Sequence, residues 1–280
     1  MRTLAPRSTP LRADCVADSA GGLTFDVPAA GGAAGAFMLL RLRGGHEEVC
    51  LPLAPAADGR LRAALPSSVA LAEGRWDAYA RVGAGEPRRL RLGATDLRSL
   101  AARTPSGFRG QVAVRIPYAR TADAARAGEP PSCEGGLVVR SWVRAPHAEA
   151  DEPLAGPGVL TVPGRVYGTG LGPRAHAEIR GRHASAPVRR AEVLAGRAGF
   201  RFTVVYAALE PGVWDLWLRP AGEAGPAVRV ARLLDDVADK ASLVRPRVRV
   251  DTPHGPLEAG PCYTRDNDLS VSVTAAAGSS

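Results

Sequence analysis

The fold is decided by Leu71-Ala-Glu-Gly-Arg-Trp-Asp-Ala-Tyr-Ala-Arg81 and by Leu209-Glu-Pro-Gly-Val-Trp-Asp-Leu-Trp-Leu-Arg219, which align residue for residue at a spacing of 138 positions. The same spacing relates Leu90-Arg-Leu92 to Val228-Arg-Val230. A match that holds over so long a register predicts that one structural unit occurs twice in the chain.

The repeat extends beyond these stretches. Ile116-Pro-Tyr-Ala-Arg120 resembles Pro261-Cys-Tyr-Thr-Arg265, and Gly136-Leu-Val-Val139 resembles Asp268-Leu-Ser-Val271. We therefore expect two domains, formed by residues 1–147 and 148–280. The first copy carries an extra segment near residues 121–135, whose glycine and proline content predicts an inserted surface loop.

Short apolar or alternating runs, bounded by glycine, proline and aspartate, recur in both copies and are typical of strands in sandwiches and barrels. Strands are expected at residues 37–43, 74–82, 89–92, 111–116, 136–143, 159–162, 176–180, 199–206, 213–218, 227–231, 248–250 and 269–273. Short helices are expected at 96–103 and 233–242. The pattern predicts an all-β protein of two tandem immunoglobulin-like antiparallel β-sandwich domains.

The composition is that of a folded globular protein, with 45% hydrophobic and 23% charged residues in 280. No window approaches the roughly 18 uninterrupted apolar residues of a membrane-spanning helix. Because no secretory signal is visible at the N-terminus, a cytoplasmic location is expected. Cys15, Cys50, Cys133 and Cys262 share no Cys-x-x-Cys spacing and are expected to be ordinary thiols.

The candidate binding residues lie in the shared motif Trp-Asp-x-aromatic-x-Arg. Because side chains alternate along a strand, Trp76 and Trp214 should face the core, and the Asp, aromatic and Arg positions should face outward. The outward residues are Asp77, Tyr79 and Arg81 in the first copy and Asp215, Trp217 and Arg219 in the second. Such an aromatic ring can stack on a sugar while the charges bind its hydroxyls. Cross-strand packing or a domain contact is the alternative interpretation.

No motif predicts catalysis. A Gly-x-Ser-x-Gly elbow, a phosphate loop ending in Lys-Ser/Thr and a Gly-x-Gly-x-x-Gly helix start are all missing. Asp266-Asn-Asp268 has the spelling of a metal-binding Asp-x-Asp element, but a turn with side-chain-to-backbone bonds is the preferred interpretation. The five histidines lack metal-ligand spacing and are expected in solvated loops. We therefore expect no catalytic residue, no metal and no cofactor.

Arginines alternate with apolar residues at 39–43, 89–92 and 245–250, so several strand faces should be rich in guanidinium groups. Together with a formal net charge of +8, this favours an anionic partner. A recognition helix and an aromatic ribonucleoprotein motif are missing, so nucleic acid is not the expected partner. A generally basic surface with interspersed acidic residues is the alternative.

The paired Gly-x-Trp-Asp-x-Tyr/Trp-x-Arg motifs, Asn267-Asp-Leu-Ser-Val271 and Ser141-Trp-Val-Arg-Ala-Pro-His-Ala-Glu149 resemble β-sandwich modules associated with actinobacterial, Streptomyces-like transferases of teichoic acid and other cell-wall glycopolymers. The resemblance implies an accessory module at the inner membrane face that binds an anionic glycopolymer, or a glycosyltransferase or polyol-phosphate transferase partner. No segment resembles the catalytic domain of those enzymes. Two alternatives stay open: a transferase that uses Asp266 and Asp268 with a metal, and a nucleic-acid-binding protein that uses strand-face arginines.

Overall fold

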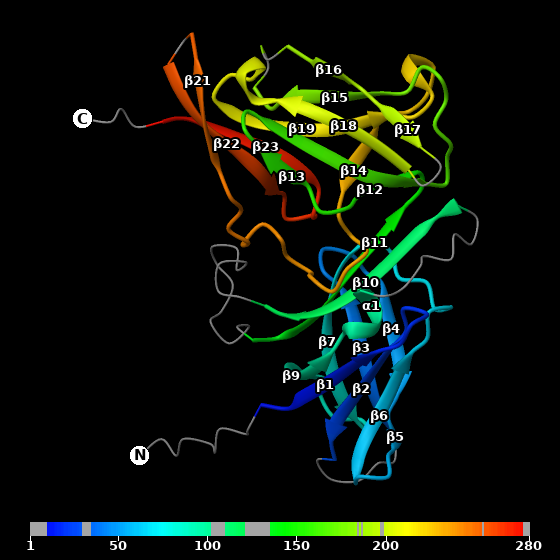
Figure 1. The fold of residues 1–280 in the computed structure, drawn as a ribbon. Coiled ribbons are helices and arrows are strands. Elements are labelled where there is room, and N and C mark those ends of the chain that lie inside the picture. Colours follow the sequence, from blue (N-terminus) through cyan, green and yellow to red (C-terminus); the bar gives the residue numbers. More distant parts are fainter. Residues whose placement is uncertain are drawn as a thin grey trace, which may run out of the picture. The chain divides into compact units, whose positions relative to one another are not determined.

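The structure is a computed structural model that describes residues 10–29, 35–101, 110–120, 135–183, 185, 187–196, 199–253 and 255–276 (Figure 1). The chain divides into two compact units, unit 1 (residues 1–104 and 113–143) and unit 2 (residues 105–112 and 144–280). The division after residue 143 lies before strand β12 (His147–Ala150). The boundary expected from the sequence, between residues 147 and 148, falls inside this strand. Among the described residues, no helix is long and apolar enough to cross a membrane.

Unit 1 is built from two β-sheets. The first runs in the order β5 (Ala54–Pro55), β6 (Arg60–Leu65), β2 (Leu23–Pro28), β1 (Arg12–Ala17) and β9 (Arg91–Asp96). The second runs β10 (Val112–Ala119), β11 (Leu137–Arg144), β7 (Gly74–Val82), β3 (Ala36–Leu42) and β4 (Glu48–Pro52), and β8 (Arg88–Arg89) also pairs with β7. Buried and exposed residues alternate along β6 and β7, so each sheet turns one apolar face to a core.

Unit 2 repeats this arrangement. Its first layer runs β17 (Leu194–Gly196), β18 (Gly199–Val205), β14 (Val159–Tyr167), β12 and β20 (Val228–Ala231), with β13 (Leu154–Gly156) beside β14. Its second layer contains β21 (Val248–Thr252), β22 (Gly255–Tyr263), β23 (Leu269–Ala275), β19 (Gly212–Arg219), β15 (His176–Gly181) and β16 (Arg189–Glu192). Strand β20 pairs with both β12 and β19, so the two layers are hydrogen-bonded into one continuous sheet.

The motif strands β7 and β19 occupy the same topological position in their units. Strand β7 lies between β3 and β11 and also pairs with β8, while β19 lies between β15 and β23 and also pairs with β20. Trp76 is opposite Val139 of β11, and Trp214 is opposite Val271 of β23. The predicted all-β sandwich fold is confirmed.

Both motif tryptophans belong to the cores, since Trp76 is 1% exposed and Trp214 is 0% exposed. Each indole Nε1 donates a hydrogen bond to the carbonyl oxygen four residues earlier, at Ala72 (3.1 Å) and at Glu210 (2.9 Å). A buried indole N–H without an acceptor would be costly, so these bonds make full burial of the ring possible.

Of the two short helices expected from the sequence, the structure contains the one in unit 1 and not the one in unit 2. In unit 1, one turn of helix α1 spans Arg98–Ala101, inside the expected range. In unit 2, the segment 233–242 contains bends and turns and no helix, so that expectation is wrong. The physical reason is that backbone N–H groups of this segment bond to distant side chains, at Leu233 and Leu234 to Glu149 and at Lys240 to Asn267. Short 3-10 turns occur at η4 (Tyr206–Ala208) and η5 (Gly222–Ala224).

The cysteines differ sharply in accessibility. Cys15 is buried, Cys50 is exposed and both are free thiols, whereas Cys133 lies outside the described residues. Burial raises the pKa of the Cys15 thiol to about 12. Because thiol reagents need an accessible thiolate, we expect an aromatic disulfide reagent to label Cys50 near neutral pH and to leave Cys15 unlabelled until unit 1 unfolds. Peptide mapping by mass spectrometry measures this, and equal labelling rates at the two positions would contradict it.

Candidate functional site

The outward carboxylate of β7, Asp77, is bound by two arginines, Arg43 directly after β3 and Arg89 of β8. Asp77 Oδ1 accepts hydrogen bonds from Arg43 Nη2 at 2.6 Å and from Arg89 Nη2 at 2.5 Å. Arg43 Nε also donates to Asp77 Oδ2 at 3.2 Å. Burial, the largest single effect, acts to lower the pKa of the Arg43 guanidinium, but the hydrogen bond to Asp77, the Asp77 charge and two nearby tyrosines together raise that pKa. This carboxylate is therefore occupied by the protein's own cations.

Tyr79 lies two residues further along β7 and is covered by guanidinium groups. The Cζ atoms of Arg41 and Arg89 lie 5.2 and 5.7 Å from the centre of its ring. Arg41 is also ion-paired with Glu48 at 2.6 Å. The ring is therefore a half-buried part of a cation–π network rather than a bare platform.

Arg81, the third outward residue of β7, differs from the arginines around Asp77. Its Cζ atom lies 5.7 Å from the centre of the Phe37 ring, which is a cation–π contact. Its Nε atom is buried and has no hydrogen-bond partner among the described residues. Arg81 is thus a half-buried cation on the face that Asp77 and Tyr79 share.

The outward carboxylate of β19, Asp215, has the same kind of surroundings. Asp215 Oδ1 accepts hydrogen bonds from Arg182 Nη2 (2.9 Å), Arg229 Nη2 (2.7 Å) and Ser270 Oγ (2.9 Å). Burial would raise the pKa of Asp215, but these three partners outweigh it and hold the pKa below its ordinary value. Asp215 is therefore ionised, and its Oδ1 atom is bound by side chains of unit 2.

Trp217 and Arg219 complete the outward face of β19. The Cζ atoms of Arg180 and Arg229 lie 4.7 and 5.3 Å from the Trp217 ring centre. Arg219 donates from Nε to Glu178 Oε1 at 3.0 Å and from Nη1 to the Gly225 carbonyl oxygen at 2.9 Å. Although burial acts to raise it, Arg180 and Arg219 lower the pKa of Glu178.

One cross-strand position gives the two faces different charges. Leu39 of β3 is opposite Tyr79, whereas Glu178 of β15 is opposite Trp217. The carboxylate that binds Arg219 therefore has an apolar counterpart in unit 1, which is why Arg81 has no such partner. The structure brings Asp77, Tyr79 and Arg81 onto one strand face of unit 1. It brings Asp215, Trp217 and Arg219 onto one strand face of unit 2.

The Asp266-Asn-Asp268 segment is a turn. Asn267 has a positive φ of 60° and is fully buried, and its neighbours donate backbone hydrogen bonds to Thr264 Oγ1. Burial, the largest effect, raises the pKa of Asp268 in spite of nearby Arg229. Across the described part of the chain, no group of three or more His, Cys, Asp or Glu side chains could hold a metal ion.

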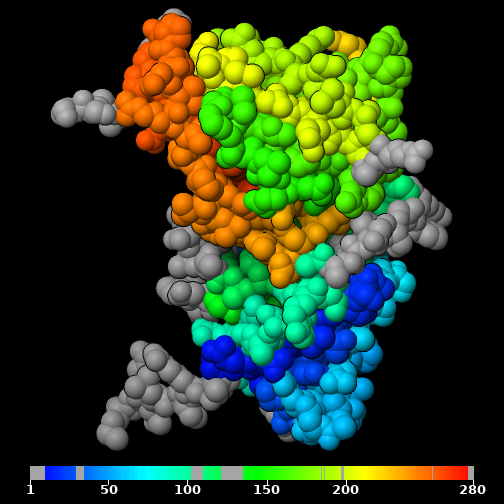
Figure 2. All heavy atoms as spheres, in the orientation of Figure 1, coloured from blue at the N-terminus to red at the C-terminus, as the bar shows by residue number. Residues whose placement is uncertain are grey.

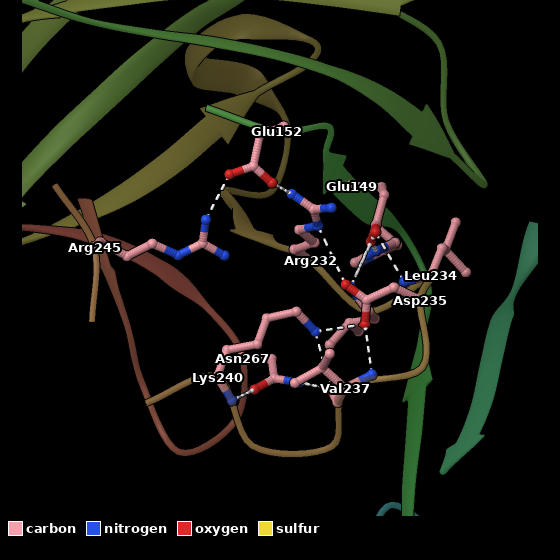
Figure 3. Close-up of polar contacts among 11 residues, drawn as sticks. Glu149, Glu152, Arg232, Leu234, Asp235, Val237, Lys240, Arg245 and Asn267 are labelled. Atoms are coloured by element: carbon pink, nitrogen blue, oxygen red, sulfur yellow. Dashed lines mark hydrogen bonds and ion pairs between the residues drawn. The ribbon is translucent and has the colours of Figure 1, made fainter. Parts of the chain in front are cut away.

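Sequence reasoning missed a buried polar cluster in unit 2 (Figure 3). Glu149 accepts hydrogen bonds from the backbone N–H groups of Leu233 and Leu234, and His147 Nε2 lies 2.7 Å from its Oε2 atom. His147 is only 2% exposed, so the expectation of a solvated loop histidine is wrong. The hydrogen-bonding partner two residues away on the same strand face is what allows an imidazole to be buried here.

Lys240, the chain's single lysine, lies in the same cluster and is 1% exposed. Its Nζ atom donates to Asp235 Oδ1 at 2.7 Å and to the Val237 carbonyl oxygen at 2.9 Å. Asn267 Nδ2 donates to the same carbonyl, and Asn267 Oδ1 accepts from Lys240 N, each at 2.9 Å. Burial lowers the pKa of Lys240, although Asp235 opposes the shift. The cluster fixes the irregular segment after β20 and carries no open reactive group.

Unit 2 also contains a pocket of about 360 Å³. Its lining includes Arg165, Val166 and Tyr167 of β14, Leu171, Gly196 of β17 and Gly199 of β18. The glycine-rich segment 168–172 is the one part of the pocket that could be singled out from the sequence, and its pattern predicts only a turn.

No protein-family model matches this sequence, and no curated protein matches it either. Among solved structures, a 217–571 fragment of S. aureus TarS is similar with a TM-score of 0.34 and 12% identity over 70% of this chain and 56% of that one. S. aureus TarS itself is similar with a TM-score of 0.32 and 10% identity over 70% of this chain and 35% of that one. A pullulanase from Anoxybacillus sp. LM18-11, complexed with maltotriose, is similar with a TM-score of 0.25 and 11% identity over 83% of this chain and 26% of that one. The chain spans about half the length of the TarS fragment.

Proposed function

We propose that the chain is a non-catalytic binding module for an anionic cell-wall glycopolymer of the teichoic-acid type, accessory to the glycosyl- or glycerophosphotransferase that makes it. The observation that carries the proposal is the arginine-rich outward face of β7, where Arg81 is half-buried, lies over the Phe37 ring on the same strand face as Tyr79, and has an Nε atom with no hydrogen-bond partner among the described residues. A half-buried guanidinium next to a ring is suited to a phosphate on a sugar or polyol chain.

The charges on the two faces support an anionic ligand. In unit 1, Arg41 pairs with Glu48, Arg43 and Arg89 pair with Asp77, and Arg81 adds a fourth cation over the Phe37 ring. In unit 2, four arginines surround three carboxylates: Arg180, Arg182, Arg219 and Arg229 with Glu178, Asp215 and Asp268. Each group keeps an excess of positive charge, and such an excess attracts polyanions over a distance set by the ionic strength.

The aromatic residues have a narrower role than an open stacking surface. Because arginines of the adjacent strands lie over the rings of Tyr79 and Trp217, a sugar reaches mainly the ring edges and the outward N–H groups of those arginines. Arg219 already binds Glu178, so we assign the larger share of binding to Arg81 in unit 1.

The expected result is salt-sensitive binding that depends on Arg81. Calorimetry with purified poly(glycerol phosphate) should give an affinity that falls from low to high ionic strength. The Arg81→Gln variant should bind about tenfold more weakly, because a charge-assisted hydrogen bond is lost. Arg62→Gln is the matched control, since Arg62 lies on the other sheet of unit 1 and pairs with Asp26 at 2.7 Å. An equal loss of affinity in both variants would mean that binding depends only on net charge, and it would contradict the assignment of the site to the outward face of β7.

Additional probes test the other functions directly. Single-stranded RNA that binds more tightly than the glycopolymer would favour a nucleic-acid-binding protein. Turnover of a nucleotide sugar by the purified chain, dependent on a divalent metal and lost in Asp268→Asn, would establish a transferase and overturn the accessory role. We expect neither result.

A further inference from the structure

We propose that the pocket in unit 2 is a separate binding site for a single sugar that carries a phosphate or carboxylate group. The pocket lies at the edge of the β17–β18–β14 layer, on strands other than β19 and its neighbours β15 and β23. Its volume of about 360 Å³ is in the range of pockets that hold small molecules. In Figure 2, the green and yellow atoms of β14 and β18 lie at the surface of unit 2.

The lining of the pocket includes an aromatic residue, Tyr167, whose ring stacks on that of its cross-strand partner. Tyr167 is the cross-strand partner of His147, and the two rings stack with centres 6.3 Å apart and planes 21° apart. His147 is itself buried and bonded to Glu149. A ring held in place by a buried pair loses little conformational entropy when a ligand packs on it. Leu171, which packs against the core, extends the apolar part of the wall.

The cation of the pocket is Arg165. Its side chain passes over Gly199, since a Cβ atom added there would lie 3.2 Å from Arg165 Cγ. Arg165 is exposed, and no carboxylate among the described residues is ion-paired with it. A guanidinium in this position presents paired N–H donors that match the oxygens of a phosphate or carboxylate.

Two glycines with different constraints, Gly196 and Gly199, also line the pocket. A Cβ atom at Gly199 would lie 2.0 Å from the Gly164 carbonyl oxygen, so the strand contact itself requires a glycine there. A Cβ atom at Gly196 would meet nothing within 4 Å. A Cβ atom at Gly196 therefore causes no clash with the described residues, and we expect a larger side chain there to narrow the pocket.

An aromatic and apolar wall beside one cation defines the class of ligand. The C–H face of a sugar packs on an aromatic ring, and the anionic group pairs with the guanidinium. A neutral sugar makes only the first contact, and inorganic phosphate makes only the second. The site should thus prefer a sugar phosphate or sugar acid to either fragment.

The test is a titration of the full chain by calorimetry and by amide NMR, with glucose 6-phosphate, glucuronate, glucose and inorganic phosphate as probes. Glucose 6-phosphate or glucuronate should bind at least about tenfold more tightly than glucose or phosphate. Arg165→Gln should weaken that binding about tenfold, and Gly196→Leu should abolish it. Arg201→Gln is the control, because Arg201 is an exposed arginine of neighbouring β18 that does not line the pocket.

Outcomes that overturn the site are equally specific. If inorganic phosphate binds as tightly as glucose 6-phosphate, the sugar contributes nothing to binding and the proposed ligand class is wrong. If Arg165→Gln binds glucose 6-phosphate as tightly as the wild-type chain, the pocket is not the binding site. If Gly196→Leu fails to fold, Tyr167→Leu replaces it, and unchanged binding in that variant has the same meaning. These probes are monomers, and Arg81 is intact in all of the pocket variants. A negative result for the pocket therefore leaves the poly(glycerol phosphate) test of β7 unaffected, and a negative result for β7 leaves the pocket test unaffected.

Discussion

Replacing Trp214 with alanine is expected to lower the free energy of unfolding of unit 2 by about 3 to 5 kcal/mol, the usual cost of emptying a large buried aromatic site. The indole is fully buried, so the variant leaves a cavity and also leaves the Glu210 carbonyl oxygen without its donor. Chemical denaturation followed by circular dichroism measures the loss, since removal of the indole would disturb a fluorescence signal.

The matched control is Trp217→Ala on the same strand. Trp217 is half-buried and contributes mainly its contacts with Arg180 and Arg229, so we expect a loss of about 1 to 2 kcal/mol. Equal losses in the two variants would mean that the inward and outward faces of β19 are not distinct. An unchanged midpoint in Trp214→Ala would show that this indole is not a core residue.

Replacing Glu149 with alanine is the second change with a large expected effect, a loss of about 3 to 5 kcal/mol in unit 2. The carboxylate accepts bonds from the backbone N–H groups of Leu233 and Leu234 and lies 2.7 Å from the His147 ring nitrogen. Alanine would leave these buried donors without an acceptor. Glu149→Gln keeps one oxygen acceptor and should be destabilised less.

The single lysine gives this prediction a local measurement. Lys240 is buried in the wild-type chain, so an amine-reactive reagent should modify it very slowly. In Glu149→Ala the segment 233–240 loses its attachment to β12, and Lys240 should be modified at least about tenfold faster, as expected for a lower free energy of local opening. Peptide mapping after timed labelling reads out the rate. An unchanged rate together with a lowered midpoint would mean that Glu149 stabilises the core and not this segment.

Local alternation made much of the fold predictable. The spacing between Trp76 and Trp214 placed both on core-facing positions of strands, and period-two runs located β7 and β19 within a residue or two. Strands such as β6 (Arg60–Leu65) carried too weak a signal, because the buried Ala63 and the exposed Ala64 are identical residues and give no contrast in hydrophobicity. The segment 233–242 has helix-forming composition, but its N–H groups bond to side chains distant in sequence.

The sequence by itself determined the all-β class and the repeated motif, since both rest on side-chain alternation and on similarity between the two halves, which are readable without knowing any contact. Only the tertiary structure decided which charged groups meet. Arg219 binds Glu178, 41 residues away, whereas Arg81 faces a strand with Leu39 at the matching position. The physical reason is that strand register, not chain proximity, brings a cation to its carboxylate, and an apolar residue at the same register position removes that carboxylate.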